Sequence, residues 1–381
     1  METRTINPGR TLAAVLAVVF CFLAFSSCRT ADNAPVLSRA NISEDTKFKA
    51  ATVDISIDGF NELGFALGDS CDISFSNGYT LTDVPYFDGY YVKNGAPVIV
   101  AYPSSQYLSI TLNNVGIWDT AGLTSDCTVT ITLNTAKKYL ATQEALGQSY
   151  SLKREDYGDD EEFSNFRALS GGNLKDGLVY RGASPVDNSR KRAACTDGLL
   201  RKYGIAAVID LADSDDDMKG YFGEEGFASA YTKALYENGK VITLSMGSSY
   251  ASDSYRQSVV SAFRYMLTTD GPYYIHCMEG KDRTGFVCCL LEALAGADYD
   301  EMRADYMKTY ENYYKIFEDS MPEKYNAIAS LYFDSFMECL TGTANTDGFR
   351  QEDIEAGARE YLRIGGMSDS EIDSFIGLIS K

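Results

Sequence analysis

One segment, YYIHCMEGKDRTGFVCCLLEALAG (residues 273–296), constrains the fold of this chain most strongly. Its first residues, aromatic or apolar up to the histidine, are typical of a short buried strand. A short glycine-containing loop follows, and the apolar run that ends at Gly296 is typical of a buried helix. A strand that leads so quickly into a helix indicates an α/β fold, because such units build mainly parallel sheets covered by helices.

Neighbouring segments extend the same pattern. The runs GIAAVIDL (204–211) and VITLSM (241–246) predict two further buried strands. SYRQSVVSAFRYML (254–267) has apolar residues at helical spacing, and the capping sequence SDSE (368–371) predicts the start of a last helix. We therefore predict, over residues 165–381, a central and mainly parallel sheet flanked by helices.

The segment before residue 137 shows the alternation of short β-strands rather than strands that alternate with helices. ATVDISI, CDISF, PVIVAY, YLSITL and CTVTITL are short, partly alternating runs rich in β-branched residues, and Asn77-Gly78 and Asn94-Gly95 are typical hairpin turns. We predict a small all-β domain, a sandwich or barrel, over residues 46–136, with a polar tether before it (29–45) and an acidic linker after it (137–164). This domain shows no cluster of catalytic side chains, so we expect it to serve as a spacer or a recognition module.

The N-terminus is typical of an export signal. Arg4 and Arg10 precede the apolar run TLAAVLAVVFCFLAF (11–25), and small residues lead to Cys28. We predict a lipoprotein signal peptide over residues 1–28, with the lipid on Cys28 and the protein anchored to a bacterial membrane outside the cytoplasm. The alternatives are ordinary secretory cleavage nearby and an uncleaved anchor, and both also place the protein outside the cytoplasm.

Charge and residue counts exclude several functions. The net charge of −20 argues against nucleic acid as a partner, because nucleic-acid binding needs a cationic face. The 381 residues include a single histidine and no C-x-x-C pattern, so we expect no metal site and no cofactor. The same single histidine excludes hydrolases that depend on several histidines.

The loop HCMEGKDRTG (276–285) carries the candidate chemistry. N–H groups between a strand end and a helix N-terminus converge on one point, where they bind anions and favour a thiolate at Cys277. Arg283 offers a planar fork that matches two oxygens of a phosphoryl group. Thr284 is placed to hydrogen-bond the sulfur, and we expect His276 to fix the loop rather than to shuttle protons.

This loop resembles the signature of cysteine-dependent protein tyrosine phosphatases, in particular the bacterial branch with H-C-x-x-G-K-D-R-T-G. NFRALSGGNLKDGLVYRGASP (165–185) is similar to the opening segment of that family, with departures at Ala168, Ser170 and Gly182. GIAAVIDLADSDDD resembles a strand that ends in D-L-R in the family, with Ala212 in place of the arginine. The resemblance covers residues 165–381, implies the cysteine-phosphatase fold there and does not extend to the all-β domain.

The resemblance implies a two-step reaction. Cys277 attacks phosphorus and forms a phosphocysteine, while phosphate oxygens are held by Arg283 and the backbone of Met278, Glu279, Gly280, Lys281 and Asp282. A carboxylic acid must protonate the leaving oxygen, and the favoured candidate is Asp282. The competitors are Asp253 and the aspartates among residues 213–217.

The substrate remains open at this point. Lys281 suits a second phosphate, as in inositide-directed relatives, whereas Glu279 adds a carboxylate that would repel highly charged headgroups. We favour a protein tyrosine phosphatase, with broad specificity open, over a phosphoinositide or inositol-polyphosphate phosphatase. A third hypothesis of another class is a catalytically weak surface-binding pseudophosphatase, which the departures at Ala168 and Ala212 keep open.

Overall fold

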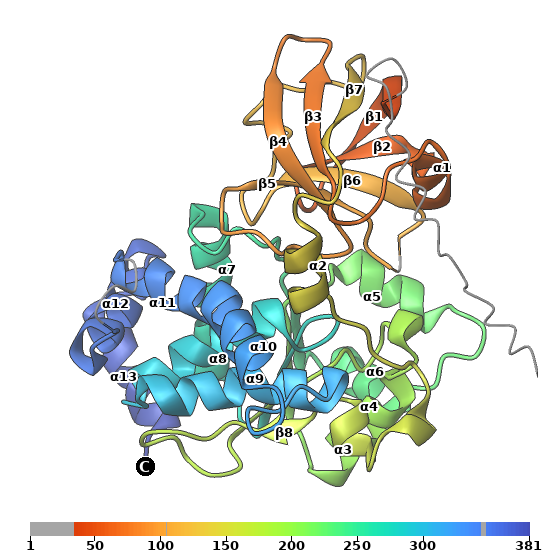
Figure 1. Ribbon diagram of the computed structural model, residues 1–381. Helices are drawn as coiled ribbons and strands as arrows, with labels where there is room; N and C mark the ends of the chain where they lie inside the picture. The colour runs from red at the N-terminus through yellow and green to blue at the C-terminus, as the bar shows by residue number, and fades with distance from the viewer. Residues whose placement is uncertain (1–33, 104, 344–347) are drawn as a thin grey trace, which may run out of the picture. The chain divides into compact units, whose positions relative to one another are not determined.

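The computed structural model describes residues 34–103, 105–343 and 348–381, and Pro35–Lys381 form one compact unit (Figure 1). The expected signal peptide, with Cys28, lies outside the described residues. No helix in the described ranges is both long and apolar enough to span a bilayer.

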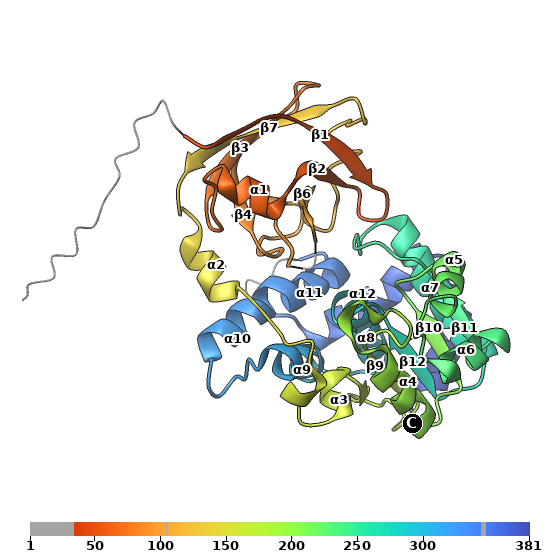
Figure 2. The same ribbon diagram turned by 90° about the vertical axis from the view of Figure 1, so that its right-hand side faces the viewer.

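The N-terminal half is a closed barrel of seven strands in the order β1-β2-β6-β5-β4-β3-β7 (Figure 2). Neighbouring strands are antiparallel except for the parallel pair β4 and β5. Asn77-Gly78 closes the β3–β4 hairpin, where Gly78 has φ +95°. The strands are β1 (Val36–Asp45), β2 (Ala50–Ser56), β3 (Ser70–Phe75), β4 (Thr80–Phe87), β5 (Pro97–Val100), β6 (Tyr107–Leu112) and β7 (Thr128–Thr135), with helix α1 (Ile57–Glu62) after β2.

The expected tether over residues 29–45 is wrong from residue 36 onward, because β1 occupies Val36–Asp45. Ile42 pairs with Val53 of β2 and Leu37 pairs with Ile131 of β7, so β1 closes the barrel. The side chains of β1 are mostly polar, so this strand is stabilised by its backbone pairing. That pairing also removes two open edges of the sheet.

The expected linker over residues 137–164 is largely folded. It contains the helices α2 (Leu140–Leu146) and α3 (Asp160–Phe163) and a short 3₁₀ turn, η2 (Arg154–Asp156). Tyr157 and Phe163 are buried against Tyr313. The acidic segment therefore begins the packed C-terminal half.

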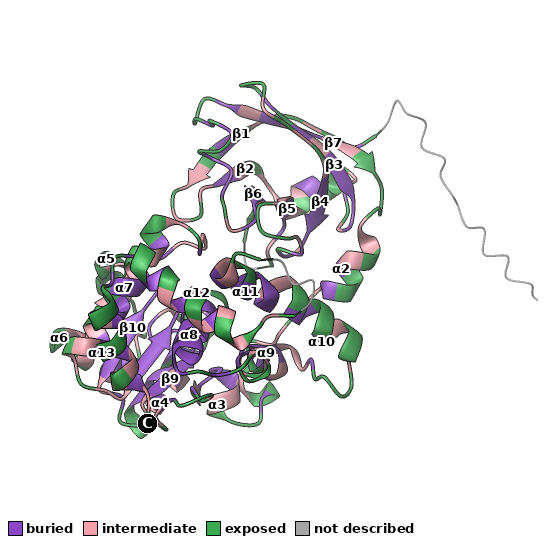
Figure 3. Ribbon diagram, turned by 90° about the vertical axis from the view of Figure 1, so that its left-hand side faces the viewer, coloured by how far each residue is buried: buried purple, intermediate pink, exposed green. Residues whose placement is uncertain are grey.

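The C-terminal half is mixed α/β, with a five-stranded sheet in the order β11-β10-β12-β9-β8. The pairs β10–β11, β10–β12 and β12–β9 are parallel, and β8 is antiparallel to β9. The strands are β8 (Arg167–Ala168), β9 (Val179–Gly182), β10 (Ala207–Asp210), β11 (Val241–Thr243) and β12 (Tyr273–His276), and β10 and β12 are buried along their full length (Figure 3).

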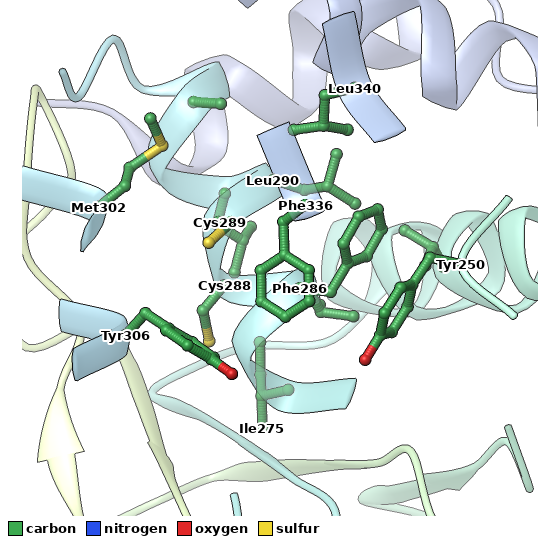
Figure 4. Close-up of a cluster of buried hydrophobic side chains, with 14 of the residues drawn as sticks. Tyr250, Ile275, Phe286, Cys288, Cys289, Leu290, Met302, Tyr306, Phe336 and Leu340 are labelled. Atoms are coloured by element: carbon green, nitrogen blue, oxygen red, sulfur yellow. The ribbon is translucent and has the colours of Figure 1, made fainter. Parts of the chain in front are cut away.

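Helices precede and follow these strands. Helix α8 is the most buried, and it packs against β12, β9, α9 and α12. Its Phe286 stacks on Tyr250 with 4.8 Å between ring centroids and meets Phe336 edge-on (Figure 4). The helices are α4 (Ala193–Lys202), α5 (Asp215–Phe222), α6 (Ala230–Glu237), α7 (Asp253–Thr268), α8 (Asp282–Leu294), α9 (Tyr299–Tyr314), α10 (Pro322–Ile328), α11 (Asp334–Thr341), α12 (Gln351–Ile364) and α13 (Asp369–Ile379).

One hydrophobic core runs through both halves. Phe87, Val98 and Val100 of the barrel belong to the same cluster of buried side chains as Ile275 and Phe286. A second cluster fills the barrel interior. Because the two halves share buried apolar surface, removal of the barrel would expose part of the core of the α/β half to water.

Candidate active site

The loop between β12 and α8 lies where three parallel strands end. The N–H of Leu211 donates to the carbonyl of His276 (2.9 Å), and the N–H of Leu244 donates to that of Asp210 (2.9 Å). The segments after β10 and β11 therefore run beside residues 277–281. Cys277 is the first loop residue and is 3% exposed, and Arg283 lies in the first turn of α8.

The backbone of the loop is shaped by a glycine that no other residue could replace. Gly280 has φ +66°, and a Cβ added there would lie 2.1 Å from the carbonyl oxygen of Gly182. Gly182 is equally confined, since its own Cβ would lie 2.6 Å from the Tyr274 hydroxyl. At Gly182, where the sequence departs from the family pattern, the Tyr274 hydroxyl therefore occupies the space that a larger side chain would need.

Side chains behind the loop hold its carbonyl groups. Asn165 Nδ2 donates to the Gly280 carbonyl (3.3 Å), and Arg181 Nη2 donates to the same oxygen (2.9 Å). The Tyr313 hydroxyl donates to the carbonyl of Glu279 (2.9 Å). Asp305 completes this support because it binds both Arg181 and Arg167. The loop is thus anchored through its outward-facing carbonyls.

The amide N–H groups of the loop remain without partners. Across the described ranges, no carbonyl or side chain accepts a hydrogen bond from the N–H groups of residues 278–282. Glu279 and Gly280 are buried residues, and buried backbone donors almost always have partners. A row of such donors at a helix N-terminus, next to a sulfur and a guanidinium, forms an anion-binding site.

Arg283 is oriented by the loop after β11. Its Nη1 donates to the carbonyl of Met246 (3.0 Å), which leaves its other N–H groups available. The Phe48 ring of the barrel lies 5.9 Å from its guanidinium carbon. Sequence reasoning did not anticipate this aromatic neighbour.

Glu279 does not present an unbalanced charge at the rim of the loop, contrary to the expectation from the sequence. The Tyr150 hydroxyl donates to its carboxylate, Arg190 Nε lies at 3.1 Å and Lys281 Nζ at 3.7 Å. Burial alone would raise the pKa of Glu279, but these three partners outweigh burial and lower it. The carboxylate is therefore ionised and its charge is compensated.

Lys281 is also held within the protein. Its ammonium group lies 3.7 Å from Glu279, 3.8 Å from Asp282 and 3.3 Å from the Tyr314 hydroxyl. These contacts direct the lysine toward residues of its own loop rather than toward a distant second phosphate. The expected role of Lys281 in binding a second phosphate therefore has little geometric support.

The three candidate acids differ in their surroundings. The Asp282 side chain is 52% exposed, and desolvation by the surrounding protein raises its pKa. Asp253, the first residue of α7, is 82% exposed and is bound by Arg256 (3.1 Å) at the surface. Asp282 thus combines access with a raised pKa, whereas nothing in its contacts brings Asp253 to the loop.

Asp213 is a stronger candidate than its place in a run of aspartates indicated. It is buried, and desolvation, followed by the nearby Asp210 carboxylate, raises its pKa to about 7. Its Oδ1 accepts a hydrogen bond from the Tyr221 hydroxyl (3.3 Å), whereas Oδ2 has no partner among the described residues. A buried carboxyl that is protonated near neutral pH is chemically suited to donate a proton.

His276 and Thr284 lie at the two ends of the loop, and both side chains are uncharged. Burial lowers the pKa of His276 to about 4, so the ring is neutral, with Nδ1 placed 3.3 Å from the carbonyl of Cys277. The Thr284 hydroxyl is buried and, within the described part of the chain, has no partner. The expected hydrogen bond from Thr284 to the sulfur is therefore not formed in this structure.

Other candidate features lie away from the loop or are not found. Two surface hollows of about 310 and 650 Å³ are lined by residues of α2, α9, α10, α11 and barrel loops, and not by the loop of Cys277.

Residues 34–103, 105–343 and 348–381 contain no group of three histidine, cysteine or acidic side chains that could hold a metal ion. The two cysteines of the barrel, Cys71 and Cys127, do not form a disulfide with each other, and both are free thiols.

A family model described as the tyrosine phosphatase family matches residues 159–376, which is more than half of the chain. The protein therefore belongs to the tyrosine phosphatase family. The match begins after the barrel, so the family does not account for the N-terminal half.

Individual relatives are more distant. The chain is 27% identical over 158 residues to the triple specificity protein phosphatase PtpB of Mycobacterium tuberculosis, which covers 34% of this chain and 54% of that protein. Among solved structures, it is similar to the core catalytic domain of the PP-IP phosphatase SIW14 of S. cerevisiae, with 16% identity, coverage of 43% and 94%, and a TM-score of 0.25. An uncharacterised conserved protein of Thermotoga maritima gives 12% identity, coverage of 25% and 35%, and a TM-score of 0.21.

Proposed function

We propose that this protein hydrolyses phosphate monoesters through a phosphocysteine intermediate and acts mainly as a protein tyrosine phosphatase. The observation that carries the proposal is the row of N–H groups in residues 278–282, which have no partner among the described residues and lie in the chain between the buried Cys277 and Arg283. This arrangement stabilises a trigonal bipyramidal phosphoryl group more than it stabilises the tetrahedral ester.

In the first step, the sulfur of Cys277 forms a bond to phosphorus while the bond from phosphorus to the ester oxygen breaks. The departing oxygen takes a proton from a carboxylic acid and leaves as the alcohol. In the second step, water attacks phosphorus and gives a proton to that carboxylate, and the sulfur leaves with the electron pair of the S–P bond. Inorganic phosphate is released, and both Cys277 and the acid return to their starting states.

We assign the acid to Asp282, because its raised pKa keeps more of it protonated and its side chain is accessible beside the loop. Asp213 is the second candidate, on the separate observation that its pKa is about 7 and that one carboxyl oxygen has no partner. Asp253, bound by Arg256 at the surface, has no comparable support.

We propose phosphotyrosine as the preferred substrate. Broad specificity is a second possibility, since the relative PtpB is described as a triple specificity phosphatase. A phosphoinositide or inositol-polyphosphate phosphatase is the alternative. The internal contacts of Lys281 weaken that alternative, because a highly phosphorylated ring needs several free cations. A pseudophosphatase, the third hypothesis, would bind phosphorylated ligands without turnover.

We further propose that the chain is exported and carries a lipid on Cys28, so that its substrates lie outside the cytoplasm. The support is the sequence of residues 1–28 alone. Labelling of cells with a radioactive fatty acid tests this proposal. Incorporation that is lost in Cys28→Ala would support it, and equal labelling of both proteins, or of neither, would count against it.

The enzymatic proposal is tested by phosphate release from a phosphotyrosine peptide, a phosphoserine peptide and phosphoinositide micelles under reducing conditions. We expect release from the phosphotyrosine peptide to be fastest and to vanish in Cys277→Ser. Faster release from the micelles would favour the lipid alternative. Binding of all three without release would favour the pseudophosphatase.

A further inference from the structure

The turn between β1 and β2 of the barrel (residues 46–49) reaches the candidate active site. Lys47 Nζ donates a hydrogen bond to the carbonyl of Ala212, which lies just after β10. A Cβ added at Gly247 would lie 3.1 Å from the carbonyl oxygen of Lys47, so the turn also touches the segment after β11. The barrel thus contacts both segments that flank the loop of Cys277.

This turn is rigid, because its own hydrogen bonds fix it. Asp45 Oδ1 accepts from the N–H groups of Lys47 and Phe48 (both 3.0 Å), and the N–H of Lys49 donates to the Asp45 carbonyl (2.7 Å). The carbonyl of Lys49 in turn accepts from the N–H of Trp118 (2.8 Å). A fixed turn presents its side chains in defined positions without an entropic cost at the moment of binding.

Phe48 places an apolar ring at the phosphate end of the site. Its ring lies 5.9 Å from the guanidinium carbon of Arg283 and remains 36% exposed. An aromatic ring with one side against a phosphate-binding arginine and another side open to solvent is positioned to pack against the organic part of a bound ester.

Lys47 brings a second positive charge to the segment after β10. The residue that it contacts there, Ala212, has no charged side chain. Burial, followed by the charge of Arg283, lowers the pKa of Lys47, while Asp213 and Asp217 act in the opposite direction. Lys47 is the chain neighbour of Phe48, whose ring lies 5.9 Å from the guanidinium carbon of Arg283, so a dianion bound at Arg283 would also attract Lys47.

A second segment of the barrel carries two neighbouring aromatic rings. Tyr90 and Tyr102 have ring centroids 6.4 Å apart, and Tyr90 is 37% exposed.

We propose that the barrel forms one wall of the substrate site, in which Phe48 selects esters of aromatic alcohols and Lys47 positions the phosphate. This inference rests on the proposed phosphatase function and deepens it, since it assigns a role to a domain that the family match does not cover. It also gives a chemical reason for a preference for phosphotyrosine over phosphoserine or inositol esters.

The test is steady-state kinetics of the full chain on a phosphotyrosine peptide and on a phosphoserine peptide of the same sequence. We expect Phe48→Ala to raise KM for the phosphotyrosine peptide by about three- to ten-fold, the range of a lost aromatic contact, with kcat and the phosphoserine reaction nearly unchanged. Lys47→Ala should weaken competitive inhibition by inorganic phosphate, and Lys47→Arg should restore it.

Two matched variants control for effects on the barrel itself. Lys49→Ala alters the same turn, but Lys49 is paired with Glu44 (2.6 Å). Tyr107→Ala removes an aromatic ring of β6 that is 41% exposed. Neither should change KM or phosphate inhibition.

Two results would overturn the inference while leaving the phosphatase intact. The first is a Phe48→Ala variant with wild-type kinetics, and the second is one that loses both reactions equally. A wild-type chain that releases no phosphate from either peptide would instead overturn the proposed function, and this inference with it.

Discussion

Replacement of Asp213 by asparagine should change how the stability of the protein depends on pH. Desolvation and the charge of Asp210 raise the pKa of Asp213 from 3.8 to about 7 in the folded state. The folded protein then binds a proton more tightly than the unfolded chain does. The contribution of this carboxyl to the stability is therefore fully present below about pH 4 and is lost as the pH rises from about 4 to about 7.

The magnitude follows from the same values. Each unit of pKa difference corresponds to about 1.4 kcal/mol, so the rise from 3.8 to about 7 corresponds to at most about 4 kcal/mol. Asp210, whose pKa burial raises to about 6, shares this buried environment, so the two carboxyls titrate together. We expect Asp213→Asn to match the wild type at pH 4 and to exceed its stability by about 2 kcal/mol or more at pH 8.

Urea unfolding at several pH values between 4 and 8 measures this difference directly. Asp253→Asn is the matched control, because the Asp253 side chain is 82% exposed. A free-energy difference between Asp213→Asn and wild type that stays constant over this range would refute the reasoning. So would a variant that is less stable than wild type at pH 8.

Three further substitutions test other parts of the account. Asp282→Asn should slow turnover of a phosphotyrosine peptide by about a hundred-fold but that of nitrophenyl phosphate by much less, and equal losses would count against Asp282 as the acid. Gly280→Ala should reduce kcat/KM by about a hundred-fold or more, because the Cβ would displace the loop from its contact with Gly182; a variant with near-normal kinetics would contradict the steric argument. Arg190→Met should lower the free energy of unfolding by about 2 kcal/mol, because it removes a cation that is paired with the buried Glu279 carboxylate. Arg190→Met combined with Glu279→Gln should recover part of this loss, and no loss in the single variant would show that the pair contributes little.

The part of the site that the sequence could predict is local in the chain. The order of a buried strand, a loop with Gly280 and an apolar helix follows from residues within one short segment, so the positions of Cys277 and Arg283 could be anticipated.

The parts that the sequence could not predict depend on contacts between distant segments. Arg181 and Asp305 support the loop from behind, but they are separated in sequence by more than a hundred residues and belong to no short motif. Strand β1 has mostly polar side chains, so only its pairing with β2 and β7 identifies it.

The properties of Asp213 and Lys47 are set by burial, which the sequence does not report. A run of aspartates is usually exposed, whereas here Asp213 is 6% exposed although the aspartates at 215–217 are exposed. Lys47 belongs to a turn of a domain without catalytic patterns, and only its contacts with distant residues, Ala212 and Gly247, relate it to the site.

Detection of the phosphocysteine tests the central claim most directly. The full-length protein is mixed with a phosphotyrosine peptide, quenched in acid within the first turnover, digested and analysed by mass spectrometry. The account predicts one added phosphoryl group on the peptide that contains Cys277, and neither adduct nor turnover in Cys277→Ser. Turnover that persists in Cys277→Ser, or a phosphoryl group on any other residue, would contradict it.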